Sequence, residues 1–241
     1  MPVPEPPAPS RRTRGGWVPT GTAAGRRAAH ASRSTRRGEQ ARRALIDAAR
    51  RVFERDGYLS TGVADIVAEA GVARGSFYTY FPAKIDVFRV VADEVTAVMD
   101  EALSSRPGDE SLDVIDGLRR SHERYMEAYR ANAAIYALTE QLAHIDDEIT
   151  ARRVARHGQD LERIAGRIRR WQVRGLADPA VDPRPTAAVL LAMTRHTCYW
   201  LYVRGDDALY TEAGAGRAIN DAWIRTLDLR REPNPEWLNP R

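Results

Sequence analysis

Apolar residues recur at helical spacing along most of this chain, and this periodicity constrains its fold more than any other feature. Between Ala41 and Phe53 they form one stripe, with charged residues on the opposite face. Similar stripes return up to Leu227, and no run of strand length alternates apolar and polar residues. Because 43% of the 241 residues are hydrophobic, the chain can bury a full core. We therefore predict an all-α protein.

Glycine residues divide the pattern into separate helices. The first helix should begin after Gly38 and end at Gly57, since glycine suits the left-handed conformation of a C-terminal cap. Thr61 can cap a short second helix, and Gly71 should form a tight turn before a short third helix. Further helices are expected at roughly 83–104, 111–130, 132–145, 147–174, 186–204 and 213–229.

The charge of the chain is concentrated at its N-terminus. Residues 1–38 contain eight arginines and one acid, so they carry +7, which leaves −3 for residues 39–241 because the whole chain carries +4. Rich in Pro, Gly, Ser and Arg, this segment buries too little apolar surface to offset its chain entropy, and we expect a disordered basic arm. Such an arm can follow DNA phosphates or enter a minor groove. A solvated tail is the alternative, and a transit peptide is disfavoured by five prolines before residue 10.

The sequence also indicates the compartment. Every apolar run meets a charged residue before it is long enough to span a bilayer, and the N-terminus has no continuous apolar segment. The single cysteine, Cys198, cannot form an internal disulfide and fits a reducing environment. We expect a cytoplasmic protein with no membrane partner and no cofactor.

The first three helices have the lengths and the glycine turn of a helix-turn-helix, whose third helix enters the DNA major groove. In that third helix, Phe77 and Phe81 are spaced to fill the small core. The residues left on its exposed side are Arg74, Gly75, Ser76, Tyr78, Thr79 and Tyr80. An aromatic-rich helix could instead serve only as core, but neighbouring tyrosines with polar tips favour an exposed role.

Residues 60–88, read as STGVADIVAEAGVARGSFYTYFPAKIDVF, closely resemble the signature of the tetracycline-repressor (TetR) family. The aliphatic, glycine, aromatic and lysine positions agree together, and the resemblance extends over the first helix. It implies a homodimeric repressor that binds double-stranded DNA and whose C-terminal helical domain binds a small molecule. It also implies that the last two long helices of each subunit form a four-helix dimer interface.

The resemblance assigns roles by motif position. Base edges would be read by Arg74, Gly75, Ser76 and Thr79, and phosphates would be held by Thr61, Tyr78, Tyr80 and Lys84. Gly62 stands where the pattern usually has Ser or Thr, so one phosphate contact would be missing. The expected domains are a basic arm (1–38), the helix-turn-helix (39–85), a ligand-binding and dimerisation domain (86–229) and a C-terminal tail (230–241).

In the second domain, aromatic and sulfur-containing side chains share helix faces. Tyr125 and Tyr129 are four residues apart, and so are His196 and Trp200. Core packing is the ordinary interpretation of such stripes, but their polar tips favour a largely apolar pocket with one or two hydrogen-bonding groups. The predicted effector-binding residues are Tyr125, Tyr129, Trp171, Met193, His196 and Trp200.

Two other classes of protein are alternatives to a ligand-responsive repressor. An all-α enzyme would need a converging catalytic set, but His196 and Cys198 are two residues apart on one predicted helix and point away from each other. A metal site is disfavoured because no two histidines show helical ligand spacing. An architectural DNA-binding protein without a ligand would have a second domain with no cavity. We predict a dimeric repressor that binds a near-palindromic operator and is released by a small, largely apolar molecule.

Overall fold

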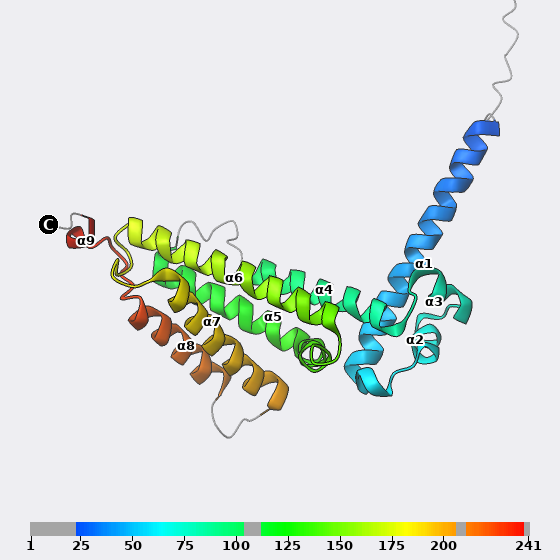
Figure 1. The fold of residues 1–241 in the computed structure, drawn as a ribbon. Helices are drawn as coiled ribbons and strands as arrows, with labels where there is room; N and C mark the ends of the chain where they lie inside the picture. The colour runs from blue at the N-terminus through cyan, green and yellow to red at the C-terminus, as the bar shows by residue number, and fades with distance from the viewer. Residues whose placement is uncertain (1–22, 104–111, 206–210, 239–241) are drawn as a thin grey trace, which may run out of the picture. The chain divides into compact units, whose positions relative to one another are not determined.

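The helical periodicity of the sequence corresponds to an all-helical structure. The computed structural model describes residues 23–103, 112–205 and 211–238, and all regular structure in those ranges is helical, which confirms the predicted class. The chain divides into two units, residues 1–42 and 43–241. The elements in Figure 1 are α1 (Ala23–Ser60), α2 (Val63–Ala70), α3 (Arg74–Tyr80), α4 (Lys84–Leu103), α5 (Val114–Leu142), α6 (Asp147–Val173), α7 (Pro183–Tyr199), the π-helical turn η2 (Trp200–Arg204), α8 (Glu212–Thr226) and α9 (Pro235–Leu238).

The first helix starts earlier than expected. It begins at Ala23, so the predicted start after Gly38 is wrong, and the part of the expected arm from Ala23 onward is helical. The reason is composition: residues 23–32 are rich in alanine, the best helix former, and one glycine inside a helix costs only about 1 kcal/mol relative to alanine. The rest of the predicted arm, residues 1–22, lies outside the described residues.

Gly57 ends the regular part of α1, as predicted. Its backbone has φ 77° and ψ 169°, a region that is open almost only to glycine. Thr61 does not cap α2, contrary to expectation, because Gly62 takes the N-cap position. The Gly62 N–H donates to Asp65 Oδ2 (2.7 Å), while the Thr61 hydroxyl donates to the Gly57 carbonyl (2.7 Å). At the other end of α2, Gly71 adopts the left-handed conformation of the predicted turn.

Aromatic side chains fill the core of the helix-turn-helix and join α1 to α4. Phe77 and Phe81 are buried, as the sequence predicted. The rings of Phe53 and Phe88 meet edge to face with centroids 5.4 Å apart, and the Tyr58 ring centroid also lies 5.4 Å from that of Phe88. The first turns of α4 therefore complete the core of the helix-turn-helix, although they lie beyond the boundary expected at residue 85.

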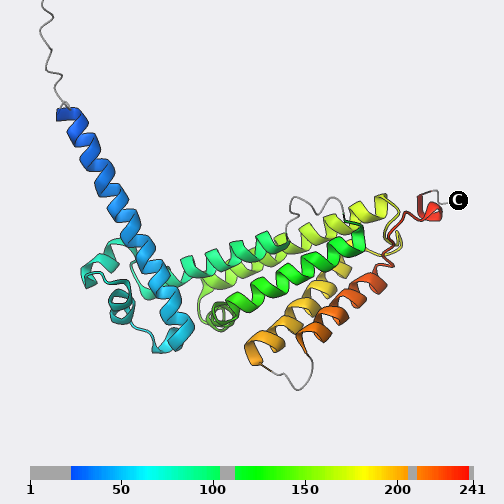
Figure 2. The ribbon, with the colours of Figure 1, turned by 180° about the vertical axis from the view of Figure 1, so that it is seen from behind.

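The remaining helices form a bundle in which α4 packs on α5 and α6 packs on α7, while α8 lies against α5 and α7 (Figures 1 and 2). Helix α5 is continuous across the break expected near residue 131. Alanines flank this position and favour a continuous helix. The buried Asn132 amide does not interrupt it, because it donates to the Ala128 carbonyl one turn earlier (2.7 Å).

The predicted C-terminal tail is tied to the bundle through backbone hydrogen bonds. Arg230 N–H donates to the Leu176 carbonyl (3.0 Å) and Asn234 N–H donates to the Gly175 carbonyl (2.8 Å). The Arg231 side chain also pairs with Asp113 and Asp116 at the start of α5. The chain beyond α8 therefore helps to hold the end of α6 and the start of α5.

Replacing Gly57 with alanine should destabilise the protein by about 1–3 kcal/mol, because an L side chain is strained at its backbone angles. Urea unfolding followed by circular dichroism measures this change. Gly158→Ala is the matched control: Gly158 lies inside α6 with free space around it, so alanine should be neutral or stabilise by up to about 1 kcal/mol. Equal effects of the two substitutions would contradict the assigned role of Gly57.

Candidate DNA interface and sensing cavity

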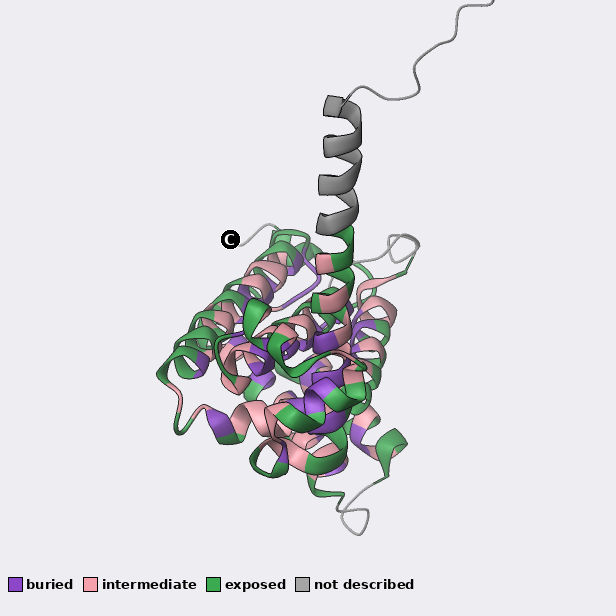
Figure 3. Ribbon diagram, turned by 90° about the vertical axis from the view of Figure 1, so that its right-hand side faces the viewer, coloured by how far each residue is buried: buried purple, intermediate pink, exposed green. Residues whose placement is uncertain are grey.

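Helix α3 exposes one polar face. Arg74, Gly75 and Thr79 are exposed, and Tyr78 exposes 53% of its surface even though its ring touches Phe77 edge-on. Ser76 and Tyr80 are half-buried beside them. Figure 3 shows this end of the molecule with buried residues inside and exposed residues on the outer turns. A short helix that presents donors, acceptors and an aromatic edge can contact base edges and phosphates in a major groove.

Two of the residues expected to hold phosphates are engaged within the protein instead. Thr61 is buried and its hydroxyl is bonded to the Gly57 carbonyl. The Lys84 ammonium donates to the carbonyls of Tyr58 (2.7 Å) and Thr61 (2.6 Å) and lies 4.1 Å from the centre of the Tyr58 ring. Burial lowers the pKa of Lys84 from its ordinary value. Lys84 thus joins the end of α1 to the start of α4, and motif position alone did not indicate these partners.

Lys84→Met should lower the free energy of unfolding by about 1–3 kcal/mol, because it removes two charge-assisted hydrogen bonds to backbone carbonyls. Urea denaturation measures the loss. Lys84→Arg, which keeps a cationic donor, should recover part of it. If Lys84→Met unfolds like the wild type but binds all DNA sequences more weakly, the ammonium serves phosphates and not the fold.

A cavity of about 450 Å³ opens between the pair α4–α5 and the pair α6–α7. Helix α4 forms one wall, with apolar side chains such as Val95 and Met99 beside the charged Arg89, Asp93 and Asp100. Tyr125 and Tyr136 of α5 contribute hydroxyl groups. The wall opposite α4 is strongly charged, with Arg152, Arg153, Arg156 and Asp160 from α6 and Arg195 from α7. The volume of this cavity lies within the range of small-molecule sites in proteins.

Of the six residues predicted to bind the effector, Tyr125 alone is part of this lining. Tyr129 is buried next to Tyr136 (ring centroids 4.6 Å apart), and its hydroxyl has no hydrogen-bond partner in the part of the chain that the structure describes. Trp171 and Met193 lie elsewhere in the bundle.

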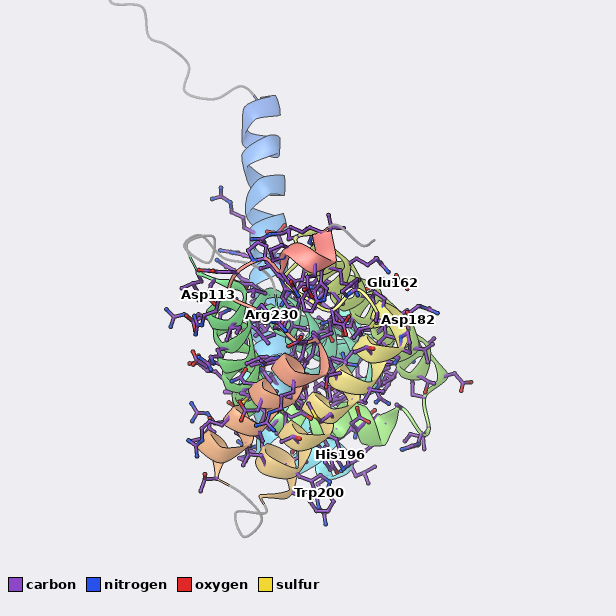
Figure 4. The ribbon with its side chains drawn as sticks, turned by 90° about the vertical axis from the view of Figure 1, so that its left-hand side faces the viewer. Asp113, Glu162, Asp182, His196, Trp200 and Arg230 are labelled. Atoms are coloured by element: carbon purple, nitrogen blue, oxygen red, sulfur yellow. The ribbon has the colours of Figure 1, made fainter. Side chains whose placement is uncertain are left out.

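The predicted residues on α7 also lie away from the cavity. His196 is exposed, and the Trp200 indole N–H donates to its Nε2 (2.8 Å), so the two side chains satisfy each other. Figure 4 shows both at the edge of the bundle. Periodicity identified a shared helix face correctly, but this face points outward. The inward residues of α7 include Thr194, Arg195 and Cys198.

The sequence reasoning missed the charged centre of the cavity wall. The Asp160 carboxylate has no exposure to solvent and forms ion pairs with Arg156, Arg163 and Arg195. Asp160 lies four residues before Ile164, on the buried face of α6, and this position was the available signal. An acid on an apolar stripe, flanked by arginines at helical spacing, indicates a buried ion cluster.

Burial fixes the protonation of the groups near this cluster. It raises the pKa of the Tyr125 and Tyr136 hydroxyls, which therefore keep their protons and can donate. Burial opposes the charge of Arg195, but Tyr136, Tyr125 and Asp160 more than compensate and raise its pKa. The Cys198 thiol, with its pKa raised to about 12 by burial, stays protonated at neutral pH and is a poor nucleophile.

A second, smaller cavity of about 20 Å³ lies behind Tyr125, next to His122. Burial lowers the pKa of His122 to about 4, although its hydrogen bond with Asn220 (2.7 Å) opposes this shift, and the charge of Arg167 lowers it further. His122 is therefore neutral at pH 7, with Nδ1 donating to the Asn220 side-chain oxygen.

The stability of the protein should fall as the pH is lowered from about 6.5 to about 4, because the unfolded chain binds a proton at His122 that the folded chain does not. The part due to His122 amounts to at most about 3 kcal/mol over this window. Urea unfolding at several pH values, compared between the wild type and His122→Asn, isolates it. Identical pH dependence of the two proteins would contradict the lowered pKa.

Among residues 23–103, 112–205 and 211–238, no helix combines the length and low polarity that crossing a bilayer requires. Within the same described ranges, no three His, Cys, Asp or Glu residues are grouped so that they could hold a metal ion.

An exposed reading helix on a helix-turn-helix, followed by a helical domain with a cavity, defines the class of one-component DNA-binding regulators. Residues 45–91 match the family described as "Bacterial regulatory proteins, tetR family". The match covers the helix-turn-helix and the start of α4, and it identifies this part of the chain as the DNA-binding region of a TetR-family transcriptional regulator.

Individual proteins agree with this assignment. The uncharacterised HTH-type regulator YxaF of Bacillus subtilis (strain 168) is 33% identical over 85 residues, which are 35% of this chain and 44% of that protein. A TetR-family regulator from Rhodococcus sp. has a TM-score of 0.63 at 18% identity, covering 78% of this chain and 99% of its own. A regulator from Saccharomonospora viridis in complex with choline has a TM-score of 0.66 at 20% identity, covering 78% and 96%. These structural similarities support the fold of both domains.

Proposed function

We propose that this protein is a ligand-responsive transcriptional repressor that binds a near-palindromic operator as a homodimer and is released when a small molecule enters the cavity between α4 and α6. The observation that supports this most is the position of the cavity. One of its walls is α4, and the first turns of α4 pack into the core of the helix-turn-helix through Phe88.

DNA reading is assigned to the exposed face of α3. Arg74, Gly75, Ser76 and Thr79 would contact base edges, while Tyr78 and Tyr80 would contact phosphates. In a homodimer, two such helices meet successive major grooves when they are about 34–36 Å apart, one turn of DNA. The operator would then consist of two related half-sites with that spacing.

Release requires the effector to favour an arrangement that does not fit DNA. Helix α4 is the proposed link, because ion pairs across the cavity region connect it to the second domain. Arg89 of α4 pairs with Asp146 (2.7 Å) and Glu148 (2.8 Å), and Asp93 of α4 pairs with Arg152 of α6. A molecule that spreads α4 from α6 would disturb these pairs and tilt α4 together with the helix-turn-helix.

The main alternative is an architectural DNA-binding protein without an effector. That function predicts a filled second domain, and a cavity of about 450 Å³ argues against it. The regulator from Saccharomonospora viridis holds choline, which gives a precedent for a small ligand on this fold. We assign this chain no catalytic residue.

Arg74→Ala should change which base is preferred at one position of each half-site, with an effect of about 1–3 kcal/mol, because a guanidinium makes directional bonds to a base edge. Selection of bound sequences from random DNA, followed by fluorescence anisotropy on the selected site, measures both preference and affinity. Arg184→Ala is the control, since Arg184 is an exposed arginine of α7 paired with Glu162. Selection of a single unrepeated half-site, or unchanged preference in Arg74→Ala, would overturn the proposal.

A further inference from the structure

We propose that the effector is an amphipathic organic acid whose carboxylate binds at the Arg195 end of the cavity while its apolar body lies along α4. This inference rests on the proposed function, because it names the chemical class that the proposed sensing cavity accepts. It differs from the sequence-based expectation of a largely apolar effector, and it follows from charges that the structure brings together.

The ion cluster beside the cavity contains more cations than anions. Arg156 and Arg163 each lie 2.5 Å from Asp100, and both also pair with Asp160, at 3.1 and 3.3 Å. Arg195 reaches the cluster from α7 and pairs with the same Asp160. Three guanidinium groups therefore share two carboxylates, so these five residues carry a net charge of +1.

One donor of the cluster is also left without an acceptor. Arg195 Nε is buried and forms no hydrogen bond within the described residues, while Arg163 Nη1 forms no hydrogen bond there but lies 3.3 Å from Asp160 Oδ1. Of the other two nitrogens of Arg195, one bonds to Asp160 and the other lies 3.2 Å from His157 Nδ1. A surplus cation with an unsatisfied donor in a partly buried site is unfavourable, and a bound carboxylate would balance the charge.

A cationic effector is not matched in the same way. The acids of the lining are already neutralised: Asp93 pairs with Arg152, Glu140 pairs with Arg153, and Asp100 and Asp160 are shared among the arginines of the cluster. A quaternary ammonium would meet no unpaired carboxylate among these four and would approach the surplus cation. This distinguishes the cavity from one suited to choline.

The neighbouring groups define the remainder of the ligand. Tyr125 and Tyr136 line the cavity near Arg195 and remain protonated, so they can donate to the second carboxylate oxygen. Ala92, Val95 and Met99 on α4 offer an apolar strip for the body of the molecule. A cavity of about 450 Å³ has room for a bicyclic aromatic acid.

The test uses three probes with the same ring system: naphthalene-2-acetate, its uncharged amide, and (2-naphthylmethyl)trimethylammonium. Isothermal titration calorimetry on the full-length protein measures their affinities, and fluorescence anisotropy on the selected operator measures DNA release. The acetate should bind about ten- to hundredfold more tightly than the amide, and the ammonium should bind most weakly.

Arg195→Gln tests the assigned residue. It removes the surplus charge but leaves Asp100 and Asp160 with two arginines, so the cluster remains balanced and the fold should persist. The variant should lose about tenfold or more in affinity for the acetate and bind the amide almost as before. Arg184→Gln removes the same charge from the same helix outside the cavity and should keep the wild-type preference.

The outcomes separate this inference from the proposed function. Tighter binding of the amide or the ammonium, no binding of any probe, or an unchanged acetate preference in Arg195→Gln would overturn the inference. Acetate binding that depends on Arg195 but leaves the operator complex intact would support the inference and contradict release by this effector. Operator release by the ammonium alone would support the proposed function and overturn the acid as effector.

Discussion

A carboxylate with no access to water must be matched by cations, and Asp160 imposes this condition on the centre of the helical bundle. Its own helix supplies Arg156 and Arg163, and α7 supplies Arg195. Arg156 and Arg163 also pair with Asp100 of α4. A single buried acid therefore connects three helices, and the cavity lies beside this connection. Because buried ion pairs are poor sources of net stability, we infer that the cluster serves chiefly to orient these helices.

The two ends of α4 are held by different forces. At its start, the rings of Phe88 and Phe53 pack edge to face, a contact that water and small ions do not replace. Further along, Asp93 and Asp100 hold α4 to α6 through ion pairs. A polar molecule can compete for such pairs, because it offers the same charges in another place. Helix α4 is thus attached to α1 by an apolar contact and to α6 by ion pairs for which a polar molecule can compete.

Sequence periodicity was sufficient for the helical class and for most of the exposed face of α3, because both depend on spacing along a single chain segment. It placed the start of α1 too late and divided α5, because alanine-rich segments continue a helix without an apolar stripe. It failed for the cavity, because a stripe identifies one face of a helix but not the helix that covers it. Trp200 and His196 lie on such a stripe and face outward. Arg195 stands directly beside His196 in the sequence, yet it lines the cavity.

The resemblance to the TetR family had a similar limit, since it fixed the position of Lys84 in the motif but not the carbonyls that the ammonium contacts. The wall between the two cavities has a consequence for how such a protein diverges. Tyr125 and Leu103 line both the large cavity and the small one next to His122. A single base change in a tyrosine codon gives serine or cysteine, and either would join the two spaces without altering the reading helix. On the proposed function, one such change would enlarge the effector site while α3, the helix proposed to contact the operator, stays the same.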